Sequence, residues 1–201
     1  MNSDKMDSDL VEEIEEMIDT LAKSGFFNTD EILEIVEDEF IEEEIDFSGF
    51  IIPQIESSNE NFTRLENAFA SLAFENIVAI HNCGYDIEEG VADAFELYVH
   101  LRNNKLSPEG FCFYTFEDVE EVIYGNVLRI TFGDFENNEK KALKIGNIVN
   151  EHLKSAGFDI NWDGTINNQI EILSFSWDKS YNSEKEYEIE GAYNSFCEVL
   201  K

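Results

Sequence analysis

The chain has 201 residues, of which 43% are hydrophobic and 17 are phenylalanine, so it holds enough apolar surface to fold around a core. The 45 Asp and Glu residues outnumber the 13 Lys and Arg residues and give a formal net charge of -32. This balance excludes direct binding to nucleic acid and disfavours binding to anionic membranes, because both depend on clustered basic side chains.

Residues 1–46 predict an acidic hairpin of two amphipathic helices. Their apolar residues recur at the spacing of one helical face: Leu10, Ile14, Met17, Ile18 and Leu21, then Ile32, Leu33, Val36 and Phe40. Ser24–Gly25 ends the first helix, and Asn28 with Glu31 resembles a capping box for the second. Residues 47–60, with Gly49, Pro53 and a polar run, are predicted to be a linker.

Residues 61–178 predict the main domain, in which helices alternate with short apolar strands. We expect strands at 77–80, 111–114, 127–132, 158–162 and 170–175. Asp163–Gly164 favours a tight hairpin turn between the last two. This order predicts an α/β (or α+β) fold with a mixed sheet of about five strands and packed helices. Residues 179–201 are expected to be a C-terminal tail with a helix.

The negative charge is concentrated in the N-terminal helices. Residues 1–60 hold 20 of the 45 acidic residues and two of the 13 basic ones. A solvated helix face is the simplest interpretation of a charge run, but like charges four residues apart destabilise a helix. The pattern therefore favours a surface that binds a basic protein, with these carboxylates as candidate contacts: Glu37, Asp38, Glu42, Glu43 and Glu44.

The loop His81–Gly90 is a second candidate binding site, because it follows the first predicted strand and open α/β sheets place ligands at such ends. His81 and Cys83 could share a metal or act as base and nucleophile, with Tyr85 and Asp86 as orienting groups. No third partner can be named from the sequence, and a histidine held by local hydrogen bonds is the alternative.

A third motif resembles the start of an EF-hand calcium loop. Asp159, Asn161 and Asp163 stand at the first three ligand positions, and Gly164 follows at position six. Position twelve, which should supply a bidentate carboxylate, is Ile170. We therefore expect a hairpin and no metal site here, and the sequence indicates no cofactor.

The compartment is inferred from three further features. The acidic start of the chain lacks the basic and apolar regions of a secretory signal, and no apolar run is long enough to span a bilayer. Cys83, Cys112 and Cys197 are widely spaced and form no C-x-x-C pair, which is typical of reduced thiols. These features predict a cytoplasmic protein.

Four short elements occur in an order that resembles an uncharacterised bacterial domain family of unknown function. They are Leu65–Leu72, the H-N-C-G-Y run that begins at His81, the G-F-C-F-Y run that begins at Gly110, and the W-D-G-T run that begins at Trp162. The resemblance covers about residues 10 to 178 and implies a cytosolic bacterial protein. It brings no catalytic residues to this chain.

The sequence thus favours a non-enzymatic acidic interaction protein, with an immunity protein that neutralises a basic toxin as its most concrete form. The alternative is a small-ligand-binding protein or an enzyme that uses the loop His81–Gly90. A calcium-responsive module at Asp159, Asn161 and Asp163 is a third, minor hypothesis. Partner identity and oligomeric state are left open.

Overall fold

A computed structural model describes residues 8–43 and 45–199 of the chain. Contacts within the chain divide it into two compact units. Unit 1 comprises the residues up to Ser58 together with Lys179–Ser183, and unit 2 comprises Asn59–Asp178 and the residues from Glu184 onward.

Unit 1 contains the predicted pair of amphipathic helices, α1 (Ser8–Ser24) and α2 (Thr29–Glu39), followed by the short 3-10 helices η1 (Ile41–Glu43) and η2 (Phe47–Gly49). The helices bury one face each against the other: Ile14, Ile18, Leu21, Ile32 and Val36. The predicted capping box forms, since Asn28 Oδ1 accepts from Glu31 N at 3.0 Å and Asn28 N donates to Glu31 Oε2 at 2.7 Å. The acidic residues of α1 and α2 are exposed, apart from the half-buried Asp19.

Unit 2 is built on a mixed sheet of five strands, which confirms the predicted fold class. The strands are β1 (Ile77–Ile80), β2 (Gly110–Phe113), β3 (Leu128–Asp134), β4 (Asp159–Asn161) and β5 (Ile170–Leu173). They lie in the order β1-β2-β3-β5-β4. The β1 and β2 strands are parallel, and the other neighbours are antiparallel.

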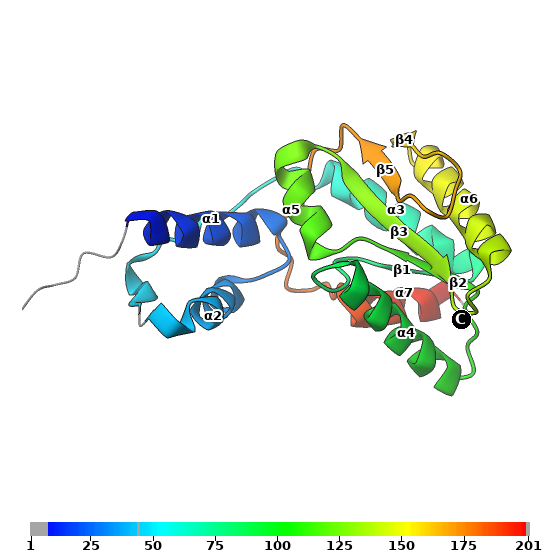
Figure 1. Cartoon of the computed structure of the whole chain (residues 1–201), viewed down its shortest axis with the longest axis horizontal. Helices are drawn as coiled ribbons and strands as arrows, with labels where there is room; N and C mark the ends of the chain where they lie inside the picture. Colours follow the sequence, from blue (N-terminus) through cyan, green and yellow to red (C-terminus); the bar gives the residue numbers. More distant parts are fainter. Residues whose placement is uncertain (1–7, 44, 200–201) are drawn as a thin grey trace, which may run out of the picture. The chain divides into compact units, whose positions relative to one another are not determined.

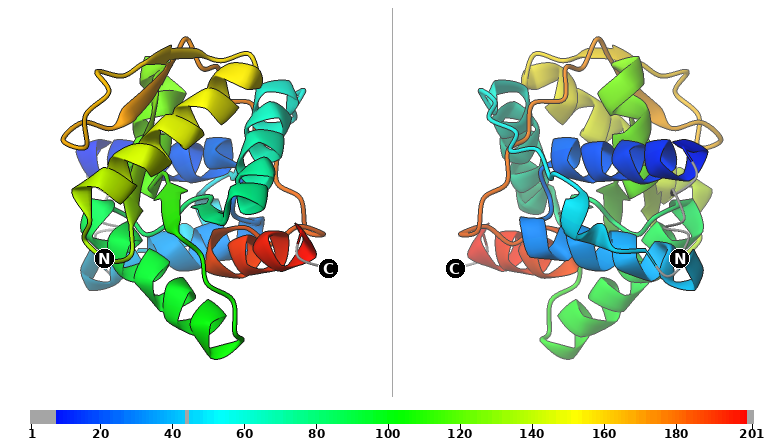
Figure 2. Two further views of the ribbon diagram at one scale, coloured as in Figure 1. Left: turned by 90° about the vertical axis from the view of Figure 1, so that its right-hand side faces the viewer. Right: turned by 90° about the vertical axis from the view of Figure 1, so that its left-hand side faces the viewer.

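Helices cover both faces of this sheet. The helices of unit 2 are α3 (Glu60–Leu72), α4 (Ile87–Asn103), α5 (Phe116–Gly125), α6 (Glu139–Ser155) and α7 (Glu188–Val199), with a 3-10 turn η3 (Ala73–Glu75). Figures 1 and 2 show α3 and α6 on one side of the sheet and α4 and α7 on the other. One apolar cluster lies under α4 and α7 and includes Ile80, Leu97, Phe111, Phe113 and Phe196.

Two local features differ from the sequence-based expectations. The helix α5 connects β2 to β3, yet these strands run antiparallel, so the parallel β-α-β arrangement holds for β1 and β2 and not for this pair. The hairpin of β4 and β5 is confirmed, but Asn161 pairs with Glu171, so residues 162–169 form a longer loop and not a tight Asp163–Gly164 turn. Hydrogen bonds inside this loop stabilise it in place of the tight turn.

Candidate functional site

The carboxylates predicted to contact a basic partner lie on the surface of unit 1. Glu37 and Asp38 occupy the last turn of α2, Glu42 and Glu43 belong to η1, and all four side chains are exposed. Glu44 lies outside the described residues. No basic residue stands in the last turn of α2. Because the carboxyl end of a helix carries partial negative charge, these carboxylates sit where a cation would be favoured.

The basic residues near this segment do little to neutralise it. Lys23 is the only Lys or Arg between Lys5 and Arg64, and its ammonium group lies 2.5 Å from Asp19 on the preceding turn of α1. Lys179 is 1% exposed, donates a hydrogen bond to the carbonyl of Gly25, and lies 4.4 Å from the ring centre of Phe26. The charge of Lys179 is therefore held inside unit 1.

His81 lies in unit 2, beside a residue that the sequence analysis did not connect with it. His81 directly follows β1 and Tyr114 directly follows β2, and the parallel register pairs Ile80 with Phe113. The two side chains therefore meet at the carboxyl ends of adjacent strands, and His81 Nδ1 lies 2.9 Å from the Tyr114 hydroxyl. The sequence could have indicated this pair, because each of the two residues stands at the end of a predicted strand.

Aromatic rings surround the half-buried imidazole of His81. Phe69 stacks on it with ring centres 4.7 Å apart, while Phe62 and Tyr187 lie at 5.5 and 5.8 Å. Tyr114 is fully buried, and this burial raises the pKa of its phenol well above the ordinary value of 10.0. The phenol therefore stays protonated at neutral pH and can donate a hydrogen bond to the imidazole.

A second polar chain continues from these rings. The Tyr187 hydroxyl donates to Glu66 Oε1 at 3.2 Å, and Lys185 Nζ lies 2.8 Å from the same oxygen. Burial raises the pKa of Tyr187, and the Glu66 carboxylate raises it further. Neither Tyr187 nor Glu66 was predicted as a site residue. They come from α3 and from the segment before α7, and no local spacing in the sequence joins those two segments.

The other candidate residues of the His81–Gly90 loop make contacts that differ from those of His81. Cys83 is 1% exposed, its thiol contacts the Gly90 carbonyl at 3.3 Å, and burial strongly raises its pKa, so it is unsuited to be a thiolate nucleophile. Asp86 caps α4 by accepting from Glu89 N at 3.0 Å. Tyr85 packs on Phe116 and donates to Glu120, so its contacts differ from those of His81.

In the motif that resembles a calcium loop, Asp163 accepts hydrogen bonds from other residues of the same loop. Asp163 accepts from Thr165 N and Thr165 Oγ1, each at 2.9 Å, and from Asn168 Nδ2 at 2.6 Å. These bonds, that from Asn168 first, lower the pKa of Asp163. Asp159 and Asn161 lie on β4. The position that should close the loop, Ile170, is buried in β5. No group of three or more His, Cys, Asp or Glu side chains arranged to hold a metal is found among the described residues.

Comparison with protein families places most of unit 2 in one family. Residues 54–181 match the Domain of unknown function (DUF6891). The chain belongs to the DUF6891 family. This confirms the resemblance to an uncharacterised domain family. No curated protein and no solved structure gives a significant match to the chain.

Only some of the candidate sites lie within the DUF6891 region. It contains His81, Tyr114 and Trp162, whereas Glu37 and the other acidic residues of α1, α2 and η1 precede it. Any role of the acidic helices is thus a property of this chain and is not implied by the family match. Within the described residues, no helix is long and apolar enough to cross a membrane.

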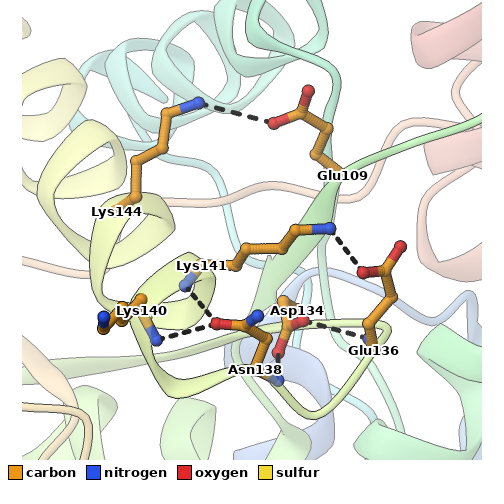
Figure 3. A network of polar contacts seen from close by, with 7 residues as sticks. All are labelled: Glu109, Asp134, Glu136, Asn138, Lys140, Lys141 and Lys144. Carbon is orange, nitrogen blue, oxygen red and sulfur yellow. Dashed lines mark hydrogen bonds and ion pairs between the residues drawn. The ribbon is translucent and has the colours of Figure 1, made fainter.

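The helix α6 has more lysines than any other described helix of the DUF6891 region, and two of them pair with nearby glutamates. Lys141 pairs with Glu136 and Lys144 pairs with Glu109 (Figure 3), and the N–O distances are 2.5 and 3.5 Å. Asn138 caps the same helix, α6, by accepting from Lys140 N and Lys141 N at 3.1 and 3.2 Å. Two of the four lysines of α6 are thus paired with carboxylates from outside the helix, which reduces the positive charge that phosphate binding would require.

Proposed function

We propose that this protein is a non-enzymatic cytoplasmic interaction protein whose acidic N-terminal helices bind a basic protein. The observation that carries the proposal is the set of exposed carboxylates at the end of α2 and in η1, where no cation stands in the last helical turn. Glu37, Asp38 and Glu39 are consecutive and Glu42 follows three positions after Glu39, so their mutual repulsion is relieved when a cationic surface approaches.

An immunity protein that neutralises a basic toxin, such as a nuclease, is the most concrete form of this function. The active site of a nuclease is shaped to attract phosphates, and an acidic surface offers the same sign of charge. A net charge of -32 also steers a basic partner toward the protein and speeds association. The proposal thus predicts a partner with excess Lys and Arg and a strongly salt-dependent association rate.

The first experiment is to capture partners from native lysate at low and high salt and to identify them by mass spectrometry. Association kinetics are then measured with the purified basic partner. The triple variant Glu37→Gln/Glu42→Gln/Glu43→Gln should associate more slowly at low salt. The difference should shrink as salt rises, because exposed charges are screened over about 10 Å at 0.1 M ionic strength.

A matched control separates a local contact from an effect of net charge. Glu75, Glu151 and Glu190 are exposed glutamates of unit 2, and changing all three to Gln alters the net charge by the same amount. The control should keep most of the wild-type rate. Equal slowing in both triple variants would show that net charge and not the α2 surface is responsible, and capture of no basic protein would contradict the proposed function.

A ligand-binding or catalytic role for the DUF6891 region is the second candidate function. It is favoured by the His81–Tyr114 pair at the carboxyl ends of two parallel strands, where α/β folds place their sites. Beside it, Asn82 is 5% exposed, and its Oδ1 accepts no hydrogen bond from the described residues although it is buried. An unpaired buried acceptor is costly, so it marks a place where a bound donor would be stabilised.

This second candidate is tested by a thermal-shift screen of metals and metabolites on the full chain. A compound that acts here should raise the melting temperature of the wild-type protein and have less effect on His81→Gln and Tyr114→Phe. His152→Gln is the matched control, since His152 belongs to the same unit and contacts Ser71 instead. Equal shifts in all variants would place the compound elsewhere.

A further inference from the structure

The loop that resembles an EF-hand borders a polar depression in unit 2. Its volume is about 380 Å³, and the residues that line it include Arg129, Asn161, Trp162, Asn168, Gln169 and Glu171. Glu171 on β5 pairs with Arg129 on β3 at one side and with Asn161 on β4 at the other side. These three side chains therefore form a row across β3, β5 and β4, on the face opposite the buried isoleucines of the same strands.

Trp162 is held in a defined position at this depression. Its indole N–H donates to the carbonyls of Thr165 and Asn168 at 3.0 and 3.2 Å. Its ring meets Phe132 edge to face with centres 5.4 Å apart. The side chain is half-buried, so part of the indole surface is available to a ligand without a rearrangement of the loop.

Amide side chains around Trp162 leave hydrogen-bond acceptors. Asn161 Nδ2 donates to Glu171 at 2.7 Å, Asn168 Nδ2 to Asp163 at 2.6 Å, and Gln169 Nε2 to Thr131 at 2.9 Å. These bonds orient the three amides and use one N–H donor of each. No hydrogen bond from any described residue reaches the amide oxygens of Asn161, Asn168 or Gln169, so each can accept one from a ligand.

Arg129 supplies donors to the same depression. Its Nη1 atom pairs with Glu121, and its Nε atom lies 3.7 Å from Glu171. A guanidinium has five N–H donors, so these two contacts leave others for a ligand. Glu171 and Asp163 repel an anionic ligand, while Arg129 repels a cationic one. These charges oppose ions of either sign at one place or another in the depression, and the mixture of donors and acceptors suits a neutral ligand that both donates and accepts hydrogen bonds.

We propose that this depression is a binding site for a neutral sugar in its pyranose form. The C–H face of a pyranose ring matches the exposed surface of an indole, and its hydroxyl groups can donate to amide and carboxylate oxygens and accept from Arg129. The volume is at the lower end of the range for ligand pockets, about 300–1,000 Å³, and suits one or two sugar rings. This site is independent of the acidic surface of unit 1.

The test follows the indole N–H resonances of the ¹⁵N-labelled full-length protein while single sugars are added at millimolar concentration. The probes are the methyl glycosides of glucose, galactose and mannose, and N-acetylglucosamine. At least one should shift the Trp162 resonance in a saturable way, with the Trp177 resonance unchanged. Trp162→Phe, followed through backbone resonances of residues 161–171, should weaken this binding about tenfold or more.

Asn161→Ala keeps the proposal testable if Trp162→Phe alters the loop. Asn161 is exposed, so its loss should leave the fold intact and still weaken the sugar shift several-fold. Asn194→Ala, an exposed asparagine on α7, is the matched control and should bind as the wild type does. Retained binding in Asn161→Ala, or no shift with any sugar, would overturn the proposal.

A lysine-rich peptide and inorganic phosphate are titrated in parallel. A shift of the Trp162 resonance by the peptide or by phosphate alone, with none from the sugars, would likewise overturn the proposal, because the depression would then recognise charge. The glutamate variants of α2 and η1 should leave sugar binding unchanged. Failure of the sugar proposal is thereby distinguished from failure of the proposed basic partner.

Discussion

The two units of this protein use carboxylates in different ways. In unit 1, Glu37, Glu42 and Glu43 are exposed, and the buried cation Lys179 binds a backbone carbonyl of the same unit. In unit 2, Asp178 accepts from the first turn of α3, at Phe62 N with a distance of 2.8 Å, and Asp118 accepts from Thr115 N at 3.0 Å. These carboxylates of unit 2 are therefore bound to the backbone of the fold, whereas Glu37, Glu42 and Glu43 of unit 1 lie exposed on its surface.

The largest effect is expected in thiol reactivity, which reports on unit 2 because all three cysteines belong to it. Cys83 and Cys112 are buried and burial raises the pKa of each thiol, whereas Cys197 is partly exposed. Cys197 should react with iodoacetamide at least about 100-fold faster than the other two in the native protein. Mass spectrometry of partly labelled protein measures the order, and equal rates would show that unit 2 opens readily.

The next effect concerns the core of unit 2. Phe113 is fully buried and stacks on Phe111 with centres 5.9 Å apart. Phe113→Ala should lower the free energy of unfolding by about 3–5 kcal/mol, because it removes a large apolar side chain and leaves a cavity. Urea unfolding followed by the fluorescence of Trp162 and Trp177, both in unit 2, measures this change.

A core variant of unit 1 sharpens this comparison. Val36 is fully buried in unit 1, and Val36→Ala should shift the same unit 2 transition less than Phe113→Ala does. An equal shift would show that the two units unfold as one cooperative system, and the distinction between them would not extend to stability.

A smaller effect is expected from the buried lysine of unit 1. Lys179→Met keeps most of the apolar stem over Phe26 but removes the hydrogen bond to the Gly25 carbonyl. The free energy of unfolding of unit 1 should fall by about 1–3 kcal/mol, because a buried acceptor loses a charged donor. Hydrogen exchange at the end of α1 measures this, and unchanged exchange would show that Lys179 does not stabilise the turn.

One substitution made in both units tests their contrast directly. Glu66→Gln weakens the contacts of Glu66 with Lys185 and Tyr187, so it should destabilise unit 2. Glu37→Gln removes a like charge near the carboxyl end of α2, so it should leave unit 1 unchanged or slightly more stable. Hydrogen exchange of α3 and α2 measures the two effects, and the same sign in both would break the comparison.

The smallest effect is a pH dependence at Asp118. Desolvation raises its pKa above the ordinary 3.8, although hydrogen bonds from Thr115 oppose the shift. The folded state therefore holds this proton more tightly than the unfolded state does, and the stability contributed is lost as pH rises through the raised pKa. Relative to wild type, Asp118→Asn should gain stability as pH rises from 3.8 into the range above it. Urea midpoints across this range measure the trend, and a constant difference would contradict it.

Asp163 provides the control of opposite sign. Hydrogen bonds from Asn168 and Thr165 lower its pKa, so its contribution is present above the ordinary pKa and is lost as pH falls through the lowered one. Asp163→Asn should therefore lose stability relative to wild type as pH rises. The opposite trends would confirm that burial dominates at Asp118 and local hydrogen bonding at Asp163.

Local sequence patterns predicted much of the fold. The β1 strand spans Ile77–Ile80 as expected from its apolar run, and Asn28 with Glu31 forms the expected capping box. Such features depend on residues that are neighbours along the chain. The position of β5 between β3 and β4 could not be predicted, because strand order depends on contacts between distant segments.

The candidate sites divide in the same way. The exposed carboxylates at Glu37 and Glu42 were identified because charge repetition is a local property of a helix. The neighbours of His81 were not, since Tyr114, Tyr187 and Glu66 come from three other segments of the chain. The hairpin around Asp163 was predicted and forms, but the depression beside Trp162 depends on the pairing of three strands.

Composition, periodicity and short motifs are local properties, and they were enough to predict the class of fold, the concentration of acidic charge in the first helices and the family resemblance. Tertiary structure decided the partners of individual polar groups. Burial and strand register bring Tyr114 to His81 and line up Arg129, Glu171 and Asn161 across the sheet, and both depend on which distant segments pack together. Residues of the same type therefore cap a helix, pair in the core or lie on the surface, depending on which residues surround them in the fold.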